Sequence, residues 1–299
     1  MQIIMPEHWK DYELIDSGNF EKLERFGNFV LSRPEPQALW DKALPDEEWK
    51  RLSNAVFKRT KGKAGDDGEK GEWLQKPGMP GQWFVDYRYK EMAIRMRLGL
   101  TSFKHVGLFP EQAGNWNYIY DTIKSIPEKT NVLNLFAYTG GASLAARAAG
   151  ADVTHVDSVK QVITWANENL KASSMDGVRW LVEDAAKFVQ REARRGNRYN
   201  GIILDPPAYG RGPEGEKWVL EDQISSLLKQ CGLILKPHNS FVVLNLYSMG
   251  FSPLIADNLL TNLLDAGNTE AGEFCFADRA GRKLPLGIFA RFRNVKKSS

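Results

Sequence analysis

From about residue 105 onward, the sequence alternates between short apolar segments and longer segments with helical periodicity. In residues 159–173, for example, apolar side chains recur every three or four positions, at Val159, Val162 and Ile163. Alternation of this kind predicts right-handed βαβ units, which build a mostly parallel sheet with helices on both faces. We therefore expect an α/β fold with a doubly wound, Rossmann-like sheet of seven strands.

Residues 1–104 have a different sequence pattern. They are mainly extended stretches, rich in aromatic and β-branched residues, with turn signals between them. We interpret them as a small N-terminal module, mainly antiparallel β. Near residues 61–82, glycine, lysine and aspartate are frequent and apolar residues are few, which predicts a flexible loop. Residues 105–299 form the second predicted domain.

The charge balance does not by itself indicate a nucleic-acid partner. The 299 residues carry 40 Lys and Arg against 37 Asp and Glu, a net charge of +3. Local groups of cations can still contact phosphates, although a solvated surface is the alternative explanation. Two such groups occur: Arg88, Lys90, Arg95 and Arg97, and then Arg191, Arg194, Arg195 and Arg198.

The sequence gives no indication of a metal site or a membrane segment. Its two cysteines, Cys231 and Cys275, lie far apart and fit neither a zinc pattern nor a disulfide framework. The N-terminus lacks a basic start followed by an apolar run, and no apolar stretch reaches about 18 residues. We expect a cytoplasmic protein without a bound metal.

The carboxyl ends of the predicted strands are the place to look for a ligand, because doubly wound sheets bind ligands there. The first strand ends in "NLFAYTGG", residues 134–141. Gly140 and Gly141 allow the backbone to approach a ligand closely and leave N–H groups available. The alternative is an ordinary turn into a helix. The stretch is neither GxGxxG nor a P-loop, since no lysine follows.

Acids end the next two strands. Asp157 comes about twenty residues after the glycines, where a carboxylate can accept both hydroxyls of a ribose. Glu183 and Asp184 end the third strand, where an acid can accept a hydrogen bond from an adenine amino group. The alternative for each acid is to cap the following helix. A second acid in this place favours S-adenosylmethionine over a nicotinamide cofactor.

The fourth strand ends in "IILDPPAYGRG", residues 202–212. Its two prolines fix φ and keep the preceding residue extended, so the Asp205 carboxylate becomes a fixed acceptor. It can hold an amino group in line with a methyl donor, which is catalysis by positioning. The alternative is a rigid start to a loop. The glycines after Tyr209 indicate a loop that can close.

Four segments, taken in order, resemble the class I S-adenosylmethionine-dependent methyltransferases: "VLNLFAYTGGASL", "HVDS", "VEDA" and "ILDPPAYGRG". More narrowly, they resemble the bacterial ribosomal RNA large-subunit cytosine-C5 methyltransferase-like family. Upstream, "GLFPEQAGNW" resembles the segment of that family that closes over the cofactor. The resemblance covers residues 105–293 and implies a methyltransferase that uses S-adenosylmethionine and acts on RNA, with ribosomal RNA as the leading candidate.

The resemblance also implies roles for individual residues. The methionine end of the cofactor is wrapped by the turn after the first strand and covered by the upstream segment, the ribose and adenine meet the next two strand ends, and the acceptor meets the fourth. The implied cofactor-binding residues are Glu111, Gln112, Phe136, Tyr138, Gly140, Gly141, Asp157, Ser158, Asp184, Ala185 and Asp205, and the implied catalytic residues are Asp205 and Pro206.

One departure concerns the acceptor atom. Methylation at cytosine C5 requires a cysteine thiolate that adds to the ring. The family places that cysteine just after the fifth strand, where this sequence has Tyr247. Cys231 falls on the apolar face of a predicted helix, as a core residue would, and Cys275 lies in a terminal hairpin. Transfer to an exocyclic or other nitrogen, or to oxygen, needs no such nucleophile.

Two other functions remain open from the sequence. One is a methyltransferase that acts on a protein or a small molecule. The other is a catalytically inactive RNA-binding protein on the same fold, since the expected cysteine is missing. A nicotinamide oxidoreductase is a more distant alternative.

Overall fold

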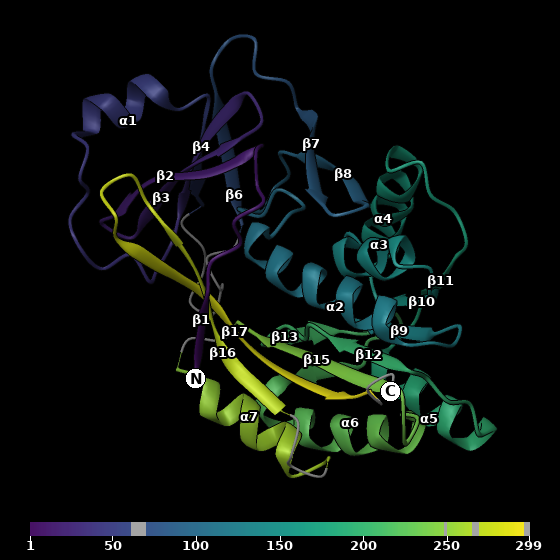
Figure 1. Cartoon of the computed structure of the whole chain (residues 1–299). Helices are drawn as coiled ribbons and strands as arrows, with labels where there is room; N and C mark the ends of the chain where they lie inside the picture. The colour runs from purple at the N-terminus through teal and green to yellow at the C-terminus, as the bar shows by residue number, and fades with distance from the viewer. Residues whose placement is uncertain (61–69, 248–249, 265–268, 296–299) are drawn as a thin grey trace.

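The computed structural model describes residues 1–60, 70–247, 250–264 and 269–295. A large mixed sheet occupies the centre, with helices on both faces and a smaller β module beside it (Figure 1). The strands of the large sheet lie in the order β1-β16-β17-β15-β12-β9-β10-β11. Their bounds are β1 Gln2–Ile4, β16 Thr269–Ala277, β17 Lys283–Asn294, β15 Ser240–Leu246, β12 Gly201–Leu204, β9 Asn131–Leu135, β10 Asp152–Asp157 and β11 Val178–Val182.

The doubly wound fold is confirmed, but the sheet has eight strands where the sequence predicted seven. All seven expected strands are present. The five central and outer ones, from β15 to β11, pair in parallel, and β17 runs antiparallel to β15 and β16. The eighth strand is β1, which pairs in parallel with β16. This short N-terminal segment satisfies backbone groups that would otherwise form an exposed sheet edge.

Two groups of helices cover the sheet. One face carries α2, α3 and α4, and the other carries α5, α6 and α7 (Figure 1). The bounds are α2 Ala113–Ser125, α3 Gly141–Ala148, α4 Lys160–Ala172, α5 Ala185–Arg195, α6 Leu220–Ile234 and α7 Pro253–Thr261. The sequence signals at α5 are clear, because the Asp184 side chain caps its first turn and Gly196, at φ 70°, ends it.

The N-terminal module contains a five-stranded sheet and a separate hairpin. The sheet order is β2-β3-β4-β5-β6, and the hairpin is β7–β8. Part of the predicted loop near residues 61–82 is a strand, since β6 pairs antiparallel with β5; residues 61–69 lie outside the described residues. The bounds are β2 Tyr12–Gly18, β3 Glu21–Phe26, β4 Phe29–Pro34, α1 Asp46–Leu52, β5 Ala55–Arg59, β6 Gly71–Gln75, β7 Gln82–Tyr89 and β8 Met92–Gly99.

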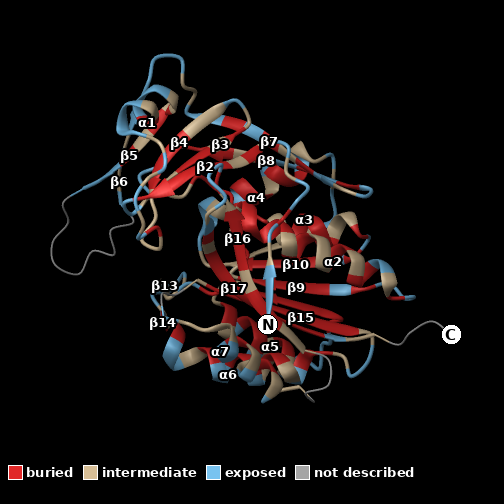
Figure 2. Cartoon of the chain, turned by 60° about the vertical axis from the view of Figure 1, so that its left-hand side comes forward, coloured by how far each residue is buried: buried red, intermediate tan, exposed pale blue. Residues whose placement is uncertain are grey.

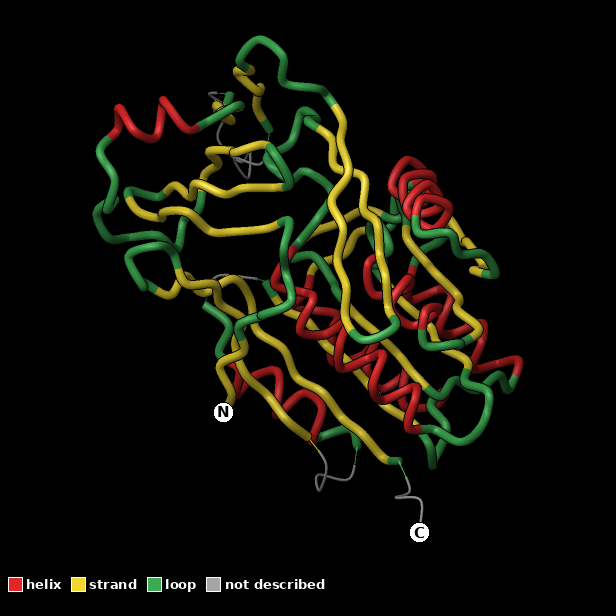
Figure 3. Tube along the Cα trace, turned by 45° about the horizontal axis from the view of Figure 1, so that its top comes forward, coloured by secondary structure: helices red, strands yellow, loops and turns green. Residues whose placement is uncertain are grey.

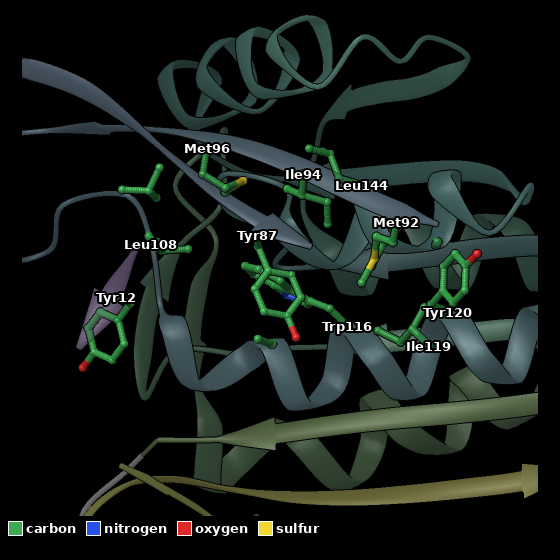
Figure 4. Packing of buried hydrophobic residues seen from close by; sticks show 14 of the residues in the cluster. Tyr12, Tyr87, Met92, Ile94, Met96, Leu108, Trp116, Ile119, Tyr120 and Leu144 are labelled. Carbon is green, nitrogen blue, oxygen red and sulfur yellow. The ribbon is translucent and has the colours of Figure 1, made fainter. Parts of the chain in front are cut away.

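The β7–β8 hairpin joins the module to the large sheet. Its inward side chains alternate along each strand, and Tyr87 and Met92 pack toward Trp116 and Ile119 of α2 (Figure 4). The hairpin lies across the helices of one sheet face (Figure 3). One continuous buried cluster therefore runs from the module into that face, while α5, α6 and α7 close a second cluster on the other. The central strands between them are buried (Figure 2).

Two expected absences can be examined in the described part of the chain. None of its helices combines the length and the apolarity needed to cross a bilayer. Within the same residues, no group of three or more His, Cys, Asp or Glu side chains is arranged to hold a metal ion.

Candidate cofactor and acceptor site

Two adjoining pockets lie at the carboxyl ends of the parallel strands. The Phe136 side chain, just after β9, lines both of them. Both pockets open to solvent, and the space in and above them amounts to about 430 Å³ and about 340 Å³. Their arrangement on either side of one residue suits an elongated ligand with two different ends.

The first pocket is built around the turn between β9 and α3. Phe136 and Tyr138 adopt left-handed backbone conformations, with φ of 53° and 48°, which side-chain-bearing residues rarely do. Strained backbone of this kind is concentrated at functional sites, where the surrounding structure enforces it. Gly140, at φ 90°, completes the turn without strain. Residues 136–142, which contain this turn, line the first pocket.

Glycine is required at positions 140 and 141 for different structural reasons. Gly140 is required by its positive φ. Gly141 is required by packing, because a Cβ there would lie 2.4 Å from Cζ2 of Trp116 on α2. The sequence interpretation, close approach of the backbone to a ligand, is therefore incomplete for Gly141, whose missing side chain admits the indole ring.

The second pocket is lined by the acids that end β10 and β11. The Asp157 carboxylate accepts hydrogen bonds from the backbone N–H groups of Tyr138 and Val159, each at 2.9 Å. The Asp184 carboxylate accepts from the N–H of Lys187 at 2.9 Å and so caps α5. Capping, the alternative considered from the sequence, is thus present at Asp184. It does not exclude ligand binding, since a carboxylate has about four acceptor positions.

A small hairpin covers the second pocket. Strands β13 Tyr209–Arg211 and β14 Lys217–Val219 pair directly after the two prolines. The Trp218 ring lies 4.8 Å from that of Phe136, and its indole N–H donates to the Pro207 carbonyl at 2.7 Å. The Lys187 ammonium of α5 forms ion pairs with Glu214 and Glu216 at the hairpin tip. The expected loop after Tyr209 is therefore an ordered hairpin attached to α5.

Two carboxyl groups lie at or near the first pocket, the half-buried Asp205 and the buried Glu111. Asp205 lines the pocket, and burial together with the nearby Glu111 charge raises its pKa to about 7. Glu111 lies in the short 3-10 helix η1, Pro110–Gln112, and is only 4% exposed; burial raises its pKa to about 7 as well. Burial raises the pKa of Tyr247 well above its usual value, and the charges of Glu111 and Asp205 raise it further.

The structure brings almost all of the sequence-predicted residues to these pockets. Glu111 and Pro206 do not line either pocket; they are buried beside Gln112 and Asp205. The first pocket is lined by Gln112, Phe136, Tyr138, Gly140, Gly141 and Asp205, and the second by Phe136, Asp157, Ser158, Asp184 and Ala185.

Sequence reasoning missed several lining residues. Asn134 and Asn245 line the first pocket, and a polar residue near the end of an apolar strand was a signal that pointed to them. Phe109 and Trp116 belong to the "GLFPEQAGNW" segment before β9, whose resemblance pointed to the cofactor, but only Glu111 and Gln112 were singled out there. Trp218 could not be predicted from the sequence, because it lines the second pocket only when the hairpin after the two prolines has formed.

The fold and the site define the class of protein. A doubly wound sheet with a glycine turn after its first strand, acids at the next two strand ends and a fixed acid at the fourth is the architecture of a class I, Rossmann-like methyltransferase. The family model of the S-adenosylmethionine-dependent methyltransferases matches residues 67–280. The chain belongs to the S-adenosylmethionine-dependent methyltransferase family.

Solved structures agree with this assignment. The S-adenosylmethionine-dependent methyltransferase from Agrobacterium tumefaciens is 38% identical and superposes with a TM-score of 0.88, covering 98% of this chain and 93% of its own. A methyltransferase structure from Streptococcus mutans shares the fold, with 16% identity and a TM-score of 0.70 over 96% of this chain and 76% of its own.

The curated relatives match over a shorter length. The "Ribosomal RNA large subunit methyltransferase K/L" of Shewanella frigidimarina is 28% identical over 165 residues, 54% of this chain and 22% of that protein. The protein of the same name from Pseudoalteromonas atlantica is 27% identical over 158 residues, 52% of this chain and 22% of its own. The chain spans about a fifth of the length of these relatives.

The cofactor is S-adenosylmethionine, and the residues present fit it. Acceptor oxygens of Asp157 and Asp184 line the second pocket, as a nucleoside requires, and the Asp205 carboxyl in the first pocket suits the cationic end of the molecule. When bound, the cofactor supplies a methyl group on a positively charged sulfur.

Proposed function

We propose that this chain methylates RNA, with ribosomal RNA as the leading candidate, at a nitrogen or oxygen atom and not at cytosine C5. The observation that carries the proposal is the corner at Asp205, where a fixed carboxyl faces the first pocket. The names of the curated relatives support RNA as the substrate. We also expect the protein to act in the cytoplasm, where ribosomal RNA is processed in bacteria.

We propose that the cofactor lies across both pockets. Its methionine end would occupy the first pocket, against the turn that contains Phe136, Tyr138 and Gly140. Its ribose hydroxyls would donate to Asp157, and its adenine amino group to Asp184. The methyl group would then point toward Asp205, which receives the acceptor.

The position of the cysteines argues against C5 chemistry. Cys231 lies in α6 and is 3% exposed, and burial raises its pKa to about 12. Cys275 lies in β16, is also 3% exposed, and has a pKa raised by burial. Neither cysteine lines either of the two pockets at the strand ends. A buried thiol with a raised pKa supplies little of the thiolate that addition to cytosine requires.

The exposed aromatic ring of Tyr209 supports a base as the acceptor. Tyr209 begins β13, four residues after Asp205, and is 71% exposed. Such rings stack on unpaired bases with roughly 1–3 kcal/mol per base. Several basic residues noted in the sequence support RNA binding less strongly, because they are engaged in ion pairs: Lys90–Asp121, Arg95–Asp86, Arg97–Glu168 and Arg191–Glu183.

The test compares modified nucleosides by mass spectrometry in cells with the gene, without it, and with the gene restored. We expect one methylated nucleoside to disappear and to return with the wild type. It should also return with a Cys231→Ala, Cys275→Ala double variant, and it should not return with Asp157→Ala. Loss of 5-methylcytidine would contradict the proposed acceptor atom.

Two other outcomes would identify the alternatives. If no nucleoside changes, the substrate is a protein or a small molecule. If the purified chain binds RNA and S-adenosylmethionine but transfers no methyl group to any RNA from cells lacking the gene, it is an RNA-binding protein without catalysis.

A further inference from the structure

A buried arginine fixes the orientation of an amide group in the wall of the first pocket. Arg291 on β17 is only 4% exposed, and its Nε donates to Oδ1 of Asn115 on α2 at 2.7 Å. The same guanidinium donates to the carboxylate of Glu270 and to the carbonyl of Gly114, each at 3.0 Å. Because a guanidinium can only donate, the side-chain oxygen of Asn115 must be the acceptor of the first bond.

Asn115 passes this orientation on to two residues of the pocket. With its oxygen held by Arg291, its nitrogen Nδ2 donates to Oε1 of Gln112 at 2.9 Å and to Oδ1 of Asn245 on β15. Both N–H bonds of the Asn115 amide are thereby used. Asn115 lines neither pocket at the strand ends, whereas Gln112 and Asn245 both line the first one.

Of these two amides, Asn245 is the one with a free end. Gln112 is bonded at both ends, because its Nε2 donates to the hydroxyl of Tyr247. The oxygen of Asn245 accepts from Asn115, but among the described residues its Nδ2 donates to no acceptor. The side chain is only 2% exposed and lines the first pocket. Since buried donors are normally paired, this group indicates an acceptor atom that a bound molecule brings.

The position of Asn245 in the sheet favours the methyl acceptor over the cofactor as that molecule. The strand order is β15-β12-β9-β10-β11, and the acids proposed to bind the nucleoside end β10 and β11, on the far side from β15. Leu204 pairs with Leu244, so Asp205 and Asn245 follow at the same level of two adjacent strands, which are spaced about 4.8 Å apart. In the proposed cofactor position the methyl group points toward Asp205. Asn245 lies one strand beyond it, where the acceptor enters.

We infer that Asn245 is a specificity-determining residue that donates a hydrogen bond to the methylated base. Its partner is a ring nitrogen or carbonyl oxygen that neighbours the atom receiving the methyl group. The inference rests on the proposed function and deepens it. A base that turns an N–H toward Asn245 would place two donors against each other, and neither hydrogen would find a lone pair. Arg291 and Asn115 are positioning residues, because they prevent the Asn245 amide from turning over.

Two substitutions change what Asn245 presents while keeping the shape of the site. Asn245→Leu keeps a branched side chain and removes the donor. Asn115→Asp keeps the acceptor for Arg291 but can no longer donate to Asn245, whose amide should turn over, donate to the new carboxylate and show its oxygen to the pocket. The matched control is Asn117→Asp, the same change on α2. Its oxygen accepts from the Tyr87 hydroxyl, which aspartate can do as well.

The test measures kcat/KM for methyl transfer to RNA from cells lacking the gene, with the methylated atom located by mass spectrometry. Asn245→Leu and Asn115→Asp should each lower kcat/KM by about 10- to 100-fold, and Asn117→Asp should match the wild type. The double variant should lose no more than Asn245→Leu alone, because Asn115 acts through the amide that is then missing. A merely structural role of Asn115 would instead add a further loss.

Two further measurements accompany the rates. Urea unfolding shows that each variant is folded. Calorimetry gives the affinity for S-adenosylhomocysteine, which should stay within about threefold of the wild type in every chain, since Asn245 faces the acceptor. If Asn245→Leu does not fold, Asn115→Asp alone decides between the results.

The possible failures are distinct. The inference is wrong if a folded Asn245→Leu or Asn115→Asp keeps the wild-type kcat/KM, or if the methyl group lies on a 2′-hydroxyl or on a base atom without a lone-pair neighbour. It is also wrong if folded Asn245→Leu loses about tenfold or more in affinity for S-adenosylhomocysteine, because the amide then binds the cofactor. In these cases the proposed RNA methylation stands. If the wild type methylates no RNA at all, the proposed function is wrong, and the inference fails with it.

Discussion

The indole ring of Trp116 lies over Gly141, so closely that a Cβ on this glycine would come within 2.4 Å of the ring. Trp116 belongs to α2 and Gly141 begins α3, and both line the first pocket. The contact therefore holds the turn between β9 and α3 against α2. Packing alone therefore requires glycine at position 141, independently of any ligand.

Gly141→Ala should destabilise the fold by about 1–3 kcal/mol, the usual cost of overpacking. In a Trp116→Leu background the same change should cost much less, because the clash is removed. Thermal or urea unfolding of the four chains checks this as a double-mutant cycle. Gly81→Ala is the control, since nothing lies within 4 Å of its Cβ position. Equal costs of Gly141→Ala in both backgrounds would contradict the packing argument.

Asp184→Asn and Asp184→Ala should separate capping from cofactor binding. Asparagine still caps a helix, so its variant should keep the wild-type stability, whereas alanine should lose about 1 kcal/mol. Both should weaken S-adenosylmethionine binding by about tenfold, because asparagine replaces one acceptor oxygen and the negative charge with an NH₂ donor, and alanine removes both oxygens. Calorimetry measures the affinity, with Asp152→Asn, an exposed acid on β10, as control. Wild-type affinity in Asp184→Asn would leave this residue with a capping role alone.

The affinity for S-adenosylmethionine should depend on pH through Asp205. With a pKa of about 7 the carboxyl is largely neutral at pH 6 and ionised at pH 8. A cationic sulfur gains from the ionised form, so affinity should rise by about 3- to 10-fold between these values. S-adenosylhomocysteine, whose sulfur is neutral, should change less. In Asp205→Asn, the ratio of the two dissociation constants should no longer depend on pH. If the ratio in that variant kept the pH dependence of the wild type, Asp205 would not have this role.

Asp205 should also make the fold less stable as pH rises. Its folded pKa of about 7 exceeds the ordinary value of 3.8, so between these values the folded state holds a proton that the unfolded chain has lost. Stability then falls with increasing pH across this window. Asp205→Asn should raise the free energy of unfolding at pH 8 by on the order of 1–3 kcal/mol and change it little at pH 4. Urea unfolding of both chains at both pH values measures the difference. A variant less stable than the wild type at pH 8 would contradict the prediction.

Lys187 should slow the release of the cofactor. Its ammonium pairs with Glu214 and Glu216 and so keeps the hairpin over the second pocket. Lys187→Met should speed dissociation by about 2- to 5-fold, and 0.5 M salt should speed the wild type while leaving the variant nearly unchanged, since salt screens exposed pairs. Stopped-flow displacement measures the rate. The control is Lys229→Met, which changes an exposed lysine on α6 and should behave like the wild type. Equal dissociation rates for the wild type and both variants would show that the ion pairs do not control release.

The acids at the strand ends could be predicted from the sequence for a simple reason. Alternating strands and helices place all parallel strands with their carboxyl ends at one edge, so Asp157, Asp184 and Asp205 had to meet there whatever the details of the loops. The same rule accounts for the five parallel strands from β15 to β11. Local signals were also sufficient for the cap of α5 and for the turn at Gly140, because both depend on residues a few positions apart.

The rest depended on tertiary structure. The bond from Arg291 to Asn115 spans 176 residues, and that from Gln112 to Tyr247 spans 135. No local pattern predicts such pairs, because they exist only once β17, β15 and the start of α2 have been brought together. The sequence by itself determined the fold class, the edge of the sheet at which the three acids meet and the absence of a cysteine at position 247. Only the folded chain decided that the charge of Glu111 acts on the pKa of Asp205, since burial near a second acid is a property of the assembled site.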